Sequence, residues 1–201
     1  MIRVEGIILA AGESRRMGYP KPLLKIDGVT FIEKISASML EVVPRLVIVL
    51  GAHAERIRPA IPRDERIAIV ENPNYSRGQL SSLKVGLAAI GAQAAAAMVQ
   101  LGDHPLVRAD SFRRLADAYE KSGVPIAIAR HAGRRGHPLI FARALFAELL
   151  DAPEDEGARY VVNRDPARVM YVDLDDPGIN LDLDTPADLK RAGLAPPPRS
   201  K

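Results

Sequence analysis

Short apolar runs alternate with segments of helical hydrophobic spacing along most of the chain. The apolar runs predict strands at 4–10, 46–50, 67–70, 96–101, 126–129 and 169–174. The helical spacing predicts helices at 30–42, 54–61, 79–90, 110–121, 142–150, 158–163 and from Pro186 onward. Because strands that are apolar throughout are buried on both faces, the alternation is typical of a mostly parallel sheet covered by helices on both sides. Segment 134–141 departs from it and predicts a turn followed by an antiparallel strand.

Two capping patterns support the predicted helices. Thr30 is followed three residues later by Glu33, as in a capping box, and Thr185 precedes Pro186 as an N-cap precedes a first helical proline. We therefore predict an α/β fold with three αβα layers and a Rossmann-like, mostly parallel sheet that includes an antiparallel strand. Residues 1–194 are expected to form one domain, and the proline-rich residues 195–201 a flexible tail.

Composition narrows the possible partners. The 201 residues are 47% hydrophobic and 26% charged, as in soluble globular proteins. A net charge of +3, an aromatic content of 4% and no Trp favour a small anionic ligand over nucleic acid. The absence of cysteine excludes thiolate catalysis, disulfides and cysteine-ligated metals. With no signal peptide and no run near the roughly 18 apolar residues of a membrane span, we expect a cytoplasmic protein without a membrane partner, and a monomer.

A glycine-rich, basic segment at residues 9–18 follows the first predicted strand, with Lys21 shortly after it. Gly12 and Gly18 allow backbone N–H groups to approach phosphate oxygens, while Arg16 and Lys21 can neutralise phosphate charge. The spacing matches neither a Walker A loop nor a G-x-G-x-x-G loop. The same residues also fit a tight turn with solvated arginines, so the segment alone leaves both interpretations open.

Carboxylates follow two later segments. Asp103 comes directly after Gly102 at the end of a predicted strand, where a carboxylate can hold Mg²⁺. In a strand, Asp182 and Asp184 would point to the same side and could complete a metal site with Asp103. Asp103 also fits a turn or a helix N-cap, and Asp184 also fits a supporting role in the cap of the last helix.

Further polar side chains stand where core packing does not need them. Gln79, Ser81 and Ser82 begin a predicted helix, where they suit a base edge or a phosphate and equally suit N-capping. His137 lies in a predicted turn, as either a substrate contact or a surface histidine. Because ligands of open parallel sheets bind beyond the carboxyl ends of the strands, we expect the polar clusters to converge there.

The segment Leu9-Ala-Ala-Gly-Glu-Ser-Arg-Arg-Met-Gly-Tyr-Pro-Lys21 resembles the signature loop of the MobA-like NTP-transferase family. The later segments 102–105, 136–138 and 181–188 resemble that family's G-D-x-P and downstream motifs in the same order. The likeness extends from residue 4 to about 191, and Ala11 resembles the cytidylyl branch, which acts on the molybdenum cofactor. His104 is a departure, because other residues also occur at this position in relatives.

The resemblance implies a fold of the nucleotide-diphospho-sugar transferase type and transfer of CMP from CTP, or a nucleotide from another NTP, to the phosphate of molybdopterin. Pyrophosphate would leave, and a molybdoenzyme would receive the product. It implies nucleotide contacts at Leu9, Ala10, Ala11, Gly12, Gly18, Lys21, Gln79, Ser81, Ser82 and Gly102, and an acceptor contact at His137. Arg16, Lys21 and Asp103 would be catalytic, with Asp103 and Asp182 holding Mg²⁺ or alternatively Mn²⁺. A sugar-phosphate acceptor and a non-catalytic cofactor carrier are the alternatives.

Overall fold

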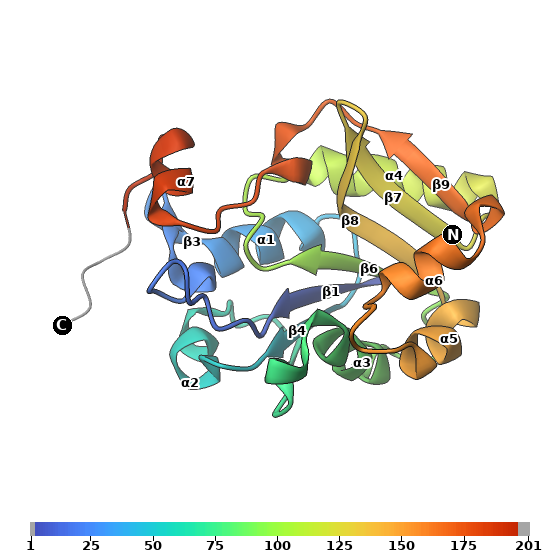
Figure 1. The fold of residues 1–201 in the computed structure, drawn as a ribbon, viewed down its shortest axis with the longest axis horizontal. Helices are drawn as coiled ribbons and strands as arrows, with labels where there is room; N and C mark the ends of the chain where they lie inside the picture. The colour runs from blue at the N-terminus through green and yellow to red at the C-terminus, as the bar shows by residue number, and fades with distance from the viewer. Residues whose placement is uncertain (1–2, 197–201) are drawn as a thin grey trace.

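A seven-stranded sheet forms the centre of the computed structural model, which describes residues 3–196 (Figure 1). Its spatial order is β5-β4-β1-β6-β8-β7-β9. The strands are β1 Val4–Ala10, β4 Leu46–Leu50, β5 Ile67–Glu71, β6 Ala96–Leu101, β7 Ile126–His131, β8 Arg134–Ala142 and β9 Val169–Asp173. Neighbours pair in parallel except for β8, which is antiparallel to both β6 and β7. The predicted parallel sheet with an antiparallel strand is therefore confirmed.

Helices cover both faces of the sheet, and each face has its own apolar core. The first core holds α1 Phe31–Leu40, α2 Ala54–Ile57 and α4 Ala109–Ser122; the second holds α3 Gln79–Ala89, α5 Phe146–Asp151 and α6 Arg159–Arg164. Along β1, Ile8 packs into the first core and its neighbour Ile7 into the second, because successive strand residues point to opposite faces. This arrangement confirms the three predicted αβα layers (Figure 1).

A smaller, third apolar cluster joins the two ends of the chain. It contains Met17, Leu24, Ile26, Phe31, Leu183 and Leu189. Met17 comes from the glycine-rich segment, and Phe31 from the start of α1. Leu24 directly precedes the short hairpin of β2 Lys25–Ile26 with β3 Val29–Thr30, and Ile26 belongs to it. Leu183 and Leu189 belong to the segment that enters and forms α7 Pro186–Arg191, which lies beside β3 in Figure 1. Strands of two residues carry no period that a sequence pattern can detect, so the hairpin was not predicted.

Local signals fixed most of the boundaries, and two predicted helices were wrong in extent. The expected capping box forms: the Glu33 N–H donates to Thr30 Oγ1 at 3.3 Å and the Thr30 N–H to Glu33 Oε2 at 2.8 Å. The helix expected at 54–61 ends at Ile57 and passes into a 3-10 turn, because Pro59 has no N–H to continue it. In the helix expected at 142–150, Ala142 still belongs to β8, and the α-helix begins only at Phe146.

The β7–β8 hairpin corrects a further expectation. Its turn is formed by Ala132 and Gly133, whose φ angles of 47° and 76° are those of a tight, type I′-like connection. Strand β8 therefore begins at Arg134, and His137 lies within the strand rather than in a turn. Gly136 is required where β8 approaches the chain near Ile179, because a Cβ there would lie 2.2 Å from the Ile179 carbonyl oxygen.

Two remaining expectations concern the chain end and the membrane. Of the predicted flexible tail 195–201, residues 197–201 lie outside the described residues. Within residues 3–196, no helix combines the length and the apolar character that crossing a membrane requires.

Candidate active site

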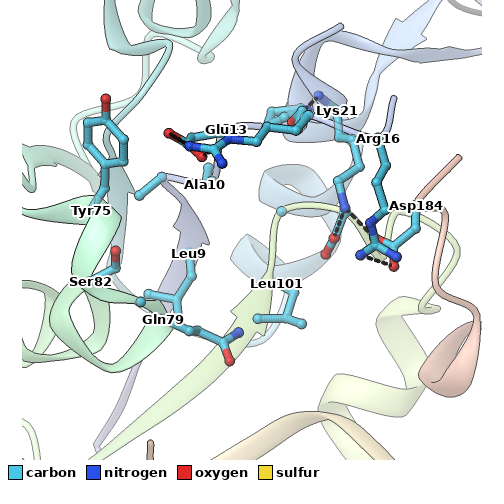
Figure 2. Close-up of a pocket in the computed structure, with 18 of the residues that line it drawn as sticks. Leu9, Ala10, Glu13, Arg16, Lys21, Tyr75, Gln79, Ser82, Leu101 and Asp184 are labelled. Carbon is cyan, nitrogen blue, oxygen red and sulfur yellow. Dashed lines mark hydrogen bonds and ion pairs between the residues drawn. The ribbon is translucent and has the colours of Figure 1, made fainter. Parts of the chain in front are cut away.

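The site lies at the carboxyl ends of β1 and β6. After β1 the chain builds β4 and β5 on one side, and then returns to place β6 on the other side of β1. Such a switch point leaves a crevice beyond the strand ends, where ligands of open α/β sheets bind. A cavity of about 380 Å³ opens there, bordered by the strand-end residues Leu9, Ala10, Leu101 and Gly102 (Figure 2).

The glycine-rich segment forms one wall of this first cavity. Ala11, Gly12 and residues 13–16 line it. A Cβ added at Gly12 would meet no protein atom within 4 Å, so the backbone there faces open space that a ligand can approach. Gly18, with φ of 68°, turns the chain outside the cavity. The segment is held in place by buried Met17 and by the Ser14 hydroxyl, which accepts a hydrogen bond from the Lys21 N–H at 3.0 Å.

Lys21 is the centre of a charged cluster on the cavity floor. Its Nζ lies 2.5 Å from Asp103 Oδ2 and 2.7 Å from Asp184 Oδ1 (Figure 2). Arg16 approaches the same Asp184 carboxylate, with Nη2 2.7 Å from Oδ2. Burial disfavours the charged ammonium, but the Asp103 and Asp184 carboxylates outweigh it and raise the pKa of Lys21. The floor of the cavity therefore carries a fixed positive charge beside two carboxylates.

Asp182 has different neighbours from Asp184. Residues 181–184 belong to no strand of the structure, so the strand expected to align Asp182 with Asp184 is absent there. Asp182 Oδ1 lies 2.9 Å from Nε2 of the buried His104, and the hydrogen bond from that ring lowers the pKa of Asp182. The same Nε2 is 3.9 Å from Asp103 Oδ1. His104 thus stands between the two carboxylates that were expected to share a metal.

The Asp184 side chain takes no part in the cap of α7, contrary to the alternative considered for it. The capping box is closed by Asp188, whose N–H donates to Thr185 Oγ1 at 3.2 Å and whose Oδ2 accepts from the Thr185 N–H at 2.7 Å. The Asp184 side chain instead contacts Lys21 and Arg16.

The wall opposite the charged cluster is built by the turn at Tyr75–Arg77 and by the start of α3. Figure 2 shows Tyr75, Gln79 and Ser82 on the side of the cavity away from Lys21, and all three line it. Ser81 lies behind this wall, 6% exposed, with its Oγ 2.8 Å from the Gly78 carbonyl oxygen. Neither serine is an N-cap, because Gly78 occupies that position.

A buried asparagine that the sequence interpretation missed organises this wall. Asn72, at the end of β5, is 2% exposed. Its Nδ2 donates to Ser81 Oγ at 2.8 Å and to Ser82 Oγ at 3.0 Å, while its Oδ1 accepts from the Asn74 N–H at 2.9 Å. One amide therefore connects β5, the loop that follows it and the first turn of α3. An asparagine directly after a strand was the only signal available for it.

A second cavity of about 500 Å³ adjoins the first and shares Leu9, Gln79 and Leu101 with it. Its apolar lining includes Leu80, Leu83, Val99, Ile128, Leu139 and Phe141. Its polar lining includes His104, His137, Asp182, Arg134, Arg135 and Arg159. The site therefore has two compartments, a charged one over the glycine-rich segment and a largely apolar one beneath β8.

The expected site residues divide between these compartments. The first cavity is lined by Leu9, Ala10, Ala11, Gly12, Arg16, Lys21, Gln79, Ser82, Gly102 and Asp103. His137 and Asp182 line the second. Gly18 and Ser81 line neither cavity.

His137 is held neutral in the second cavity. Its ring packs edge-on against His104, with centroids 5.9 Å apart. Burial, followed by the nearby His104, lowers the pKa of His137 to about 4. A neutral imidazole can both donate and accept a hydrogen bond, which suits contact with an uncharged polar ligand group.

This depressed pKa predicts a pH dependence of folding. In the unfolded chain His137 binds a proton near pH 6.5, whereas in the folded chain it does so only near pH 4. The contribution of His137 to the free energy of unfolding is therefore fully present above pH 6.5. It declines as the pH falls from 6.5 towards 4. We expect NMR titration of the His137 ring protons, assigned with a His137→Gln sample, to give a midpoint near 4. A midpoint near 6.5 would contradict the prediction.

Comparisons with known proteins give one family match and relatives whose names differ in activity. A family model described as a MobA-like NTP transferase domain matches residues 6–169. The molybdenum cofactor cytidylyltransferase of Escherichia coli (strain K12) is 27% identical over 192 residues, which cover 94% of each chain. Nicotine blue oxidoreductase of Paenarthrobacter nicotinovorans is 31% identical, over 94% of this chain and 95% of that one.

A solved structure has a similar fold over nearly the whole chain. Rv0371c of Mycobacterium tuberculosis H37Rv superposes with a TM-score of 0.82 and 31% identity, covering 94% of this chain and 96% of its own. A second structure of that protein, a complex with manganese, gives a TM-score of 0.77 at 30% identity, over 94% and 97% of the two chains.

Proposed function

Since the chain belongs to the MobA-like NTP transferase family and is a nucleotidyltransferase, we propose that it transfers CMP from CTP to the phosphate of a molybdopterin-type acceptor. The observation that carries the proposal is Lys21, bound by Asp103 and Asp184 on the floor of a cavity walled by the glycine-rich segment. The acceptor is proposed from the cytidylyltransferase relative and from the apolar second cavity.

The chain's own residues can perform this reaction by positioning and charge neutralisation. The backbone around Gly12 binds triphosphate oxygens, and Arg16 with Lys21 stabilises the charge that develops on the leaving pyrophosphate. An acceptor phosphate at the shared boundary of the two cavities lies beside the α-phosphate. Its oxygen attacks the α-phosphorus in line, a new P–O bond forms, and the bond to the β-phosphate breaks. The attacking oxygen is already anionic, so the step needs no strong general base.

The carboxylates of the floor fit a divalent cation. Asp103 and Asp184 already converge on the ammonium of Lys21, and hard oxygen donors are the ligands of Mg²⁺ and Mn²⁺. We propose that Asp103 holds the metal with Asp184, whereas the sequence favoured Asp182, which instead contacts His104. When bound, the ion supplies charge neutralisation for the phosphates. The manganese complex of Rv0371c supports a divalent metal in this family.

Two carboxamide variants distinguish the proposed metal ligands. We expect Asp184→Asn to weaken Mn²⁺ binding, measured by electron paramagnetic resonance with CTP present, by about tenfold, because a carboxylate oxygen is lost. Asp182→Asn, whose contact is His104, is the matched comparison and is expected to change Mn²⁺ affinity less. The reverse ranking would assign the metal to Asp182.

The Asn72 cluster predicts a defect in nucleotide binding. We expect Asn72→Ala to lower the free energy of unfolding by about 1–3 kcal/mol, since it leaves buried hydroxyls without a donor. It should also raise KM for CTP more than it lowers kcat, because the displaced loop lines the first cavity rather than contacting the reacting atoms. Urea unfolding and steady-state kinetics measure both, with exposed Asn163→Ala as control. A loss of stability with an unaltered KM would show a purely structural role.

The function is tested by pyrophosphate release from a panel of nucleotides and acceptors. We expect release from CTP with molybdopterin and Mg²⁺, and little with GTP or UTP. Release only with sugar 1-phosphates would identify the alternative acceptor class. Tight binding with no release from any pair would identify a carrier. A redox reaction without pyrophosphate would align the chain with its oxidoreductase relative.

A further inference from the structure

Three arginines of the second cavity make no hydrogen bond or ion pair among the described residues, although the charge of Arg134 helps to lower the pKa of Asp182. Arg134 and Arg135 at the start of β8 and Arg159 at the start of α6 line the cavity. Among residues 3–196, none of the three makes a side-chain hydrogen bond or ion pair. The arginines around them are paired: Arg130 with Asp173, and Arg164 and Arg168 with Glu148.

Two of these arginines gain no electrostatic stabilisation from the fold itself. Arg135 lies directly opposite Arg130 in the β7–β8 register, and because Asp173 is already engaged by Arg130, Arg135 gains no partner across the strands. Arg159 is the first residue of α6, where the positive end of the helix dipole disfavours a cation. Neither the strand pair nor the start of α6 is stabilised by these two charges, so they remain available to an anionic ligand.

The carboxylates of the cavity offset the charge of the arginines only in part, through the electrostatic effect of Arg134 on Asp182. Glu154 pairs with Arg77 at 2.6 Å, and Asp182 is engaged by His104. Asp155 is the one remaining carboxylate among the lining residues. The cavity thus combines an apolar floor with an excess of positive charge at one part of its wall.

The arginines cannot serve the reacting phosphate in the way Lys21 does. They line the second cavity and are not part of the first, which contains Lys21 and Asp103. Arg134 and Arg135 also border a shallow surface hollow with Arg130 and Tyr171, so this part of the wall reaches the outside. If the phosphate of an acceptor lies at the shared boundary of the two cavities, a different group of the same acceptor lies near the arginines.

We propose that the second cavity binds a flat heterocyclic acceptor that carries a second anionic group, and that Arg134, Arg135 and Arg159 bind this group. That the reacting end of this acceptor is a phosphate rests on the proposed function. The apolar floor takes the ring and the guanidinium groups take the anion by charge-assisted hydrogen bonds. These arginines then select among phosphorylated acceptors without touching the reacting atoms.

Two fluorescent probes that differ in one anionic group test the site directly. Pterin-6-carboxylate and 6-hydroxymethylpterin share the ring, and only the first carries a carboxylate. We expect the wild-type protein to bind the carboxylate about tenfold more tightly in fluorescence titrations. The triple variant Arg134→Gln, Arg135→Gln, Arg159→Gln should bind both probes equally. Arg164→Gln, which removes a charge from α6 outside the cavity, should keep the tenfold preference.

Three results would overturn the inference: equal binding of the probes by wild type, no saturable binding of either, or an undiminished preference in the triple variant. Pyrophosphate release from CTP and molybdopterin, measured on the same wild-type sample, separates this inference from the proposed function. Release without a carboxylate preference overturns the arginine site alone. A preference that the triple variant loses, without release, supports the arginine site and rejects the proposed transfer.

Discussion

Replacing Asp103 by asparagine is expected to lower kcat for CTP-dependent pyrophosphate release by about 10²- to 10³-fold. The carboxamide has nearly the same shape but lacks the charge that a divalent cation and Lys21 require. Folding should be preserved, because Lys21 keeps its second carboxylate, Asp184, at 2.7 Å. Kinetics with saturating Mg²⁺ and urea unfolding of the same preparation measure the two effects separately.

Asp117→Asn is the matched control for this change. Asp117 is exposed on α4 and lines neither cavity of the site, and the substitution alters the net charge equally. Its kcat should equal that of the wild type. If Asp103→Asn retained more than a tenth of wild-type turnover, the floor of the first cavity would not be the site of charge stabilisation.

Replacing Lys21 by methionine is expected to reduce kcat/KM to a similar extent and, unlike Asp103→Asn, to destabilise the fold. Methionine fills comparable space but leaves Asp103 and Asp184 facing each other without the ammonium that lies 2.5 and 2.7 Å from them. The Lys21 side chain is 14% exposed, so solvent compensates little, and a loss of about 1–2 kcal/mol is expected.

Added Mg²⁺ should restore part of this stability, since a cation can replace the missing ammonium between the carboxylates. Thermal unfolding with and without Mg²⁺ measures the recovery, with Lys34→Met on α1 as the control for a lost lysine. Unchanged stability of Lys21→Met would show that the two carboxylates separate once the ammonium is removed.

The elements that the sequence predicted well are those with a local physical cause. The Thr30–Glu33 capping box depends on two residues three apart, and it is present at the start of α1. The departure of segment 134–141 from the apolar alternation identified β8 as the antiparallel strand. The hairpin turn was misplaced, because Gly136 and Pro138 resemble turn residues whereas the turn is made by Ala132, an unusual residue for positive φ, and Gly133.

The contacts that define the site join residues far apart in the chain. Asp184 reaches Lys21 across 163 positions, whereas the nearer capping role belongs to Asp188. A motif showed that carboxylates stand near residue 182, but not which one faces Lys21 and which one faces His104. Ser81 and Ser82 look equivalent in sequence, yet one helical step places Ser82 at the cavity and Ser81 behind it.

The third apolar cluster has a consequence for how the protein becomes active during its synthesis. Met17 and Phe31 pack against Leu183 and Leu189, so the glycine-rich segment is supported by the chain that follows β9. A nascent chain that has emerged only as far as β9 contains every strand of the central sheet but lacks the second carboxylate beside Lys21. Translation must deliver residues 181–191 before the site that we propose for nucleotide transfer is complete. A protease that removes this segment would take Asp184 away from Lys21 and Leu183 and Leu189 away from the third cluster, while sparing every strand of the sheet.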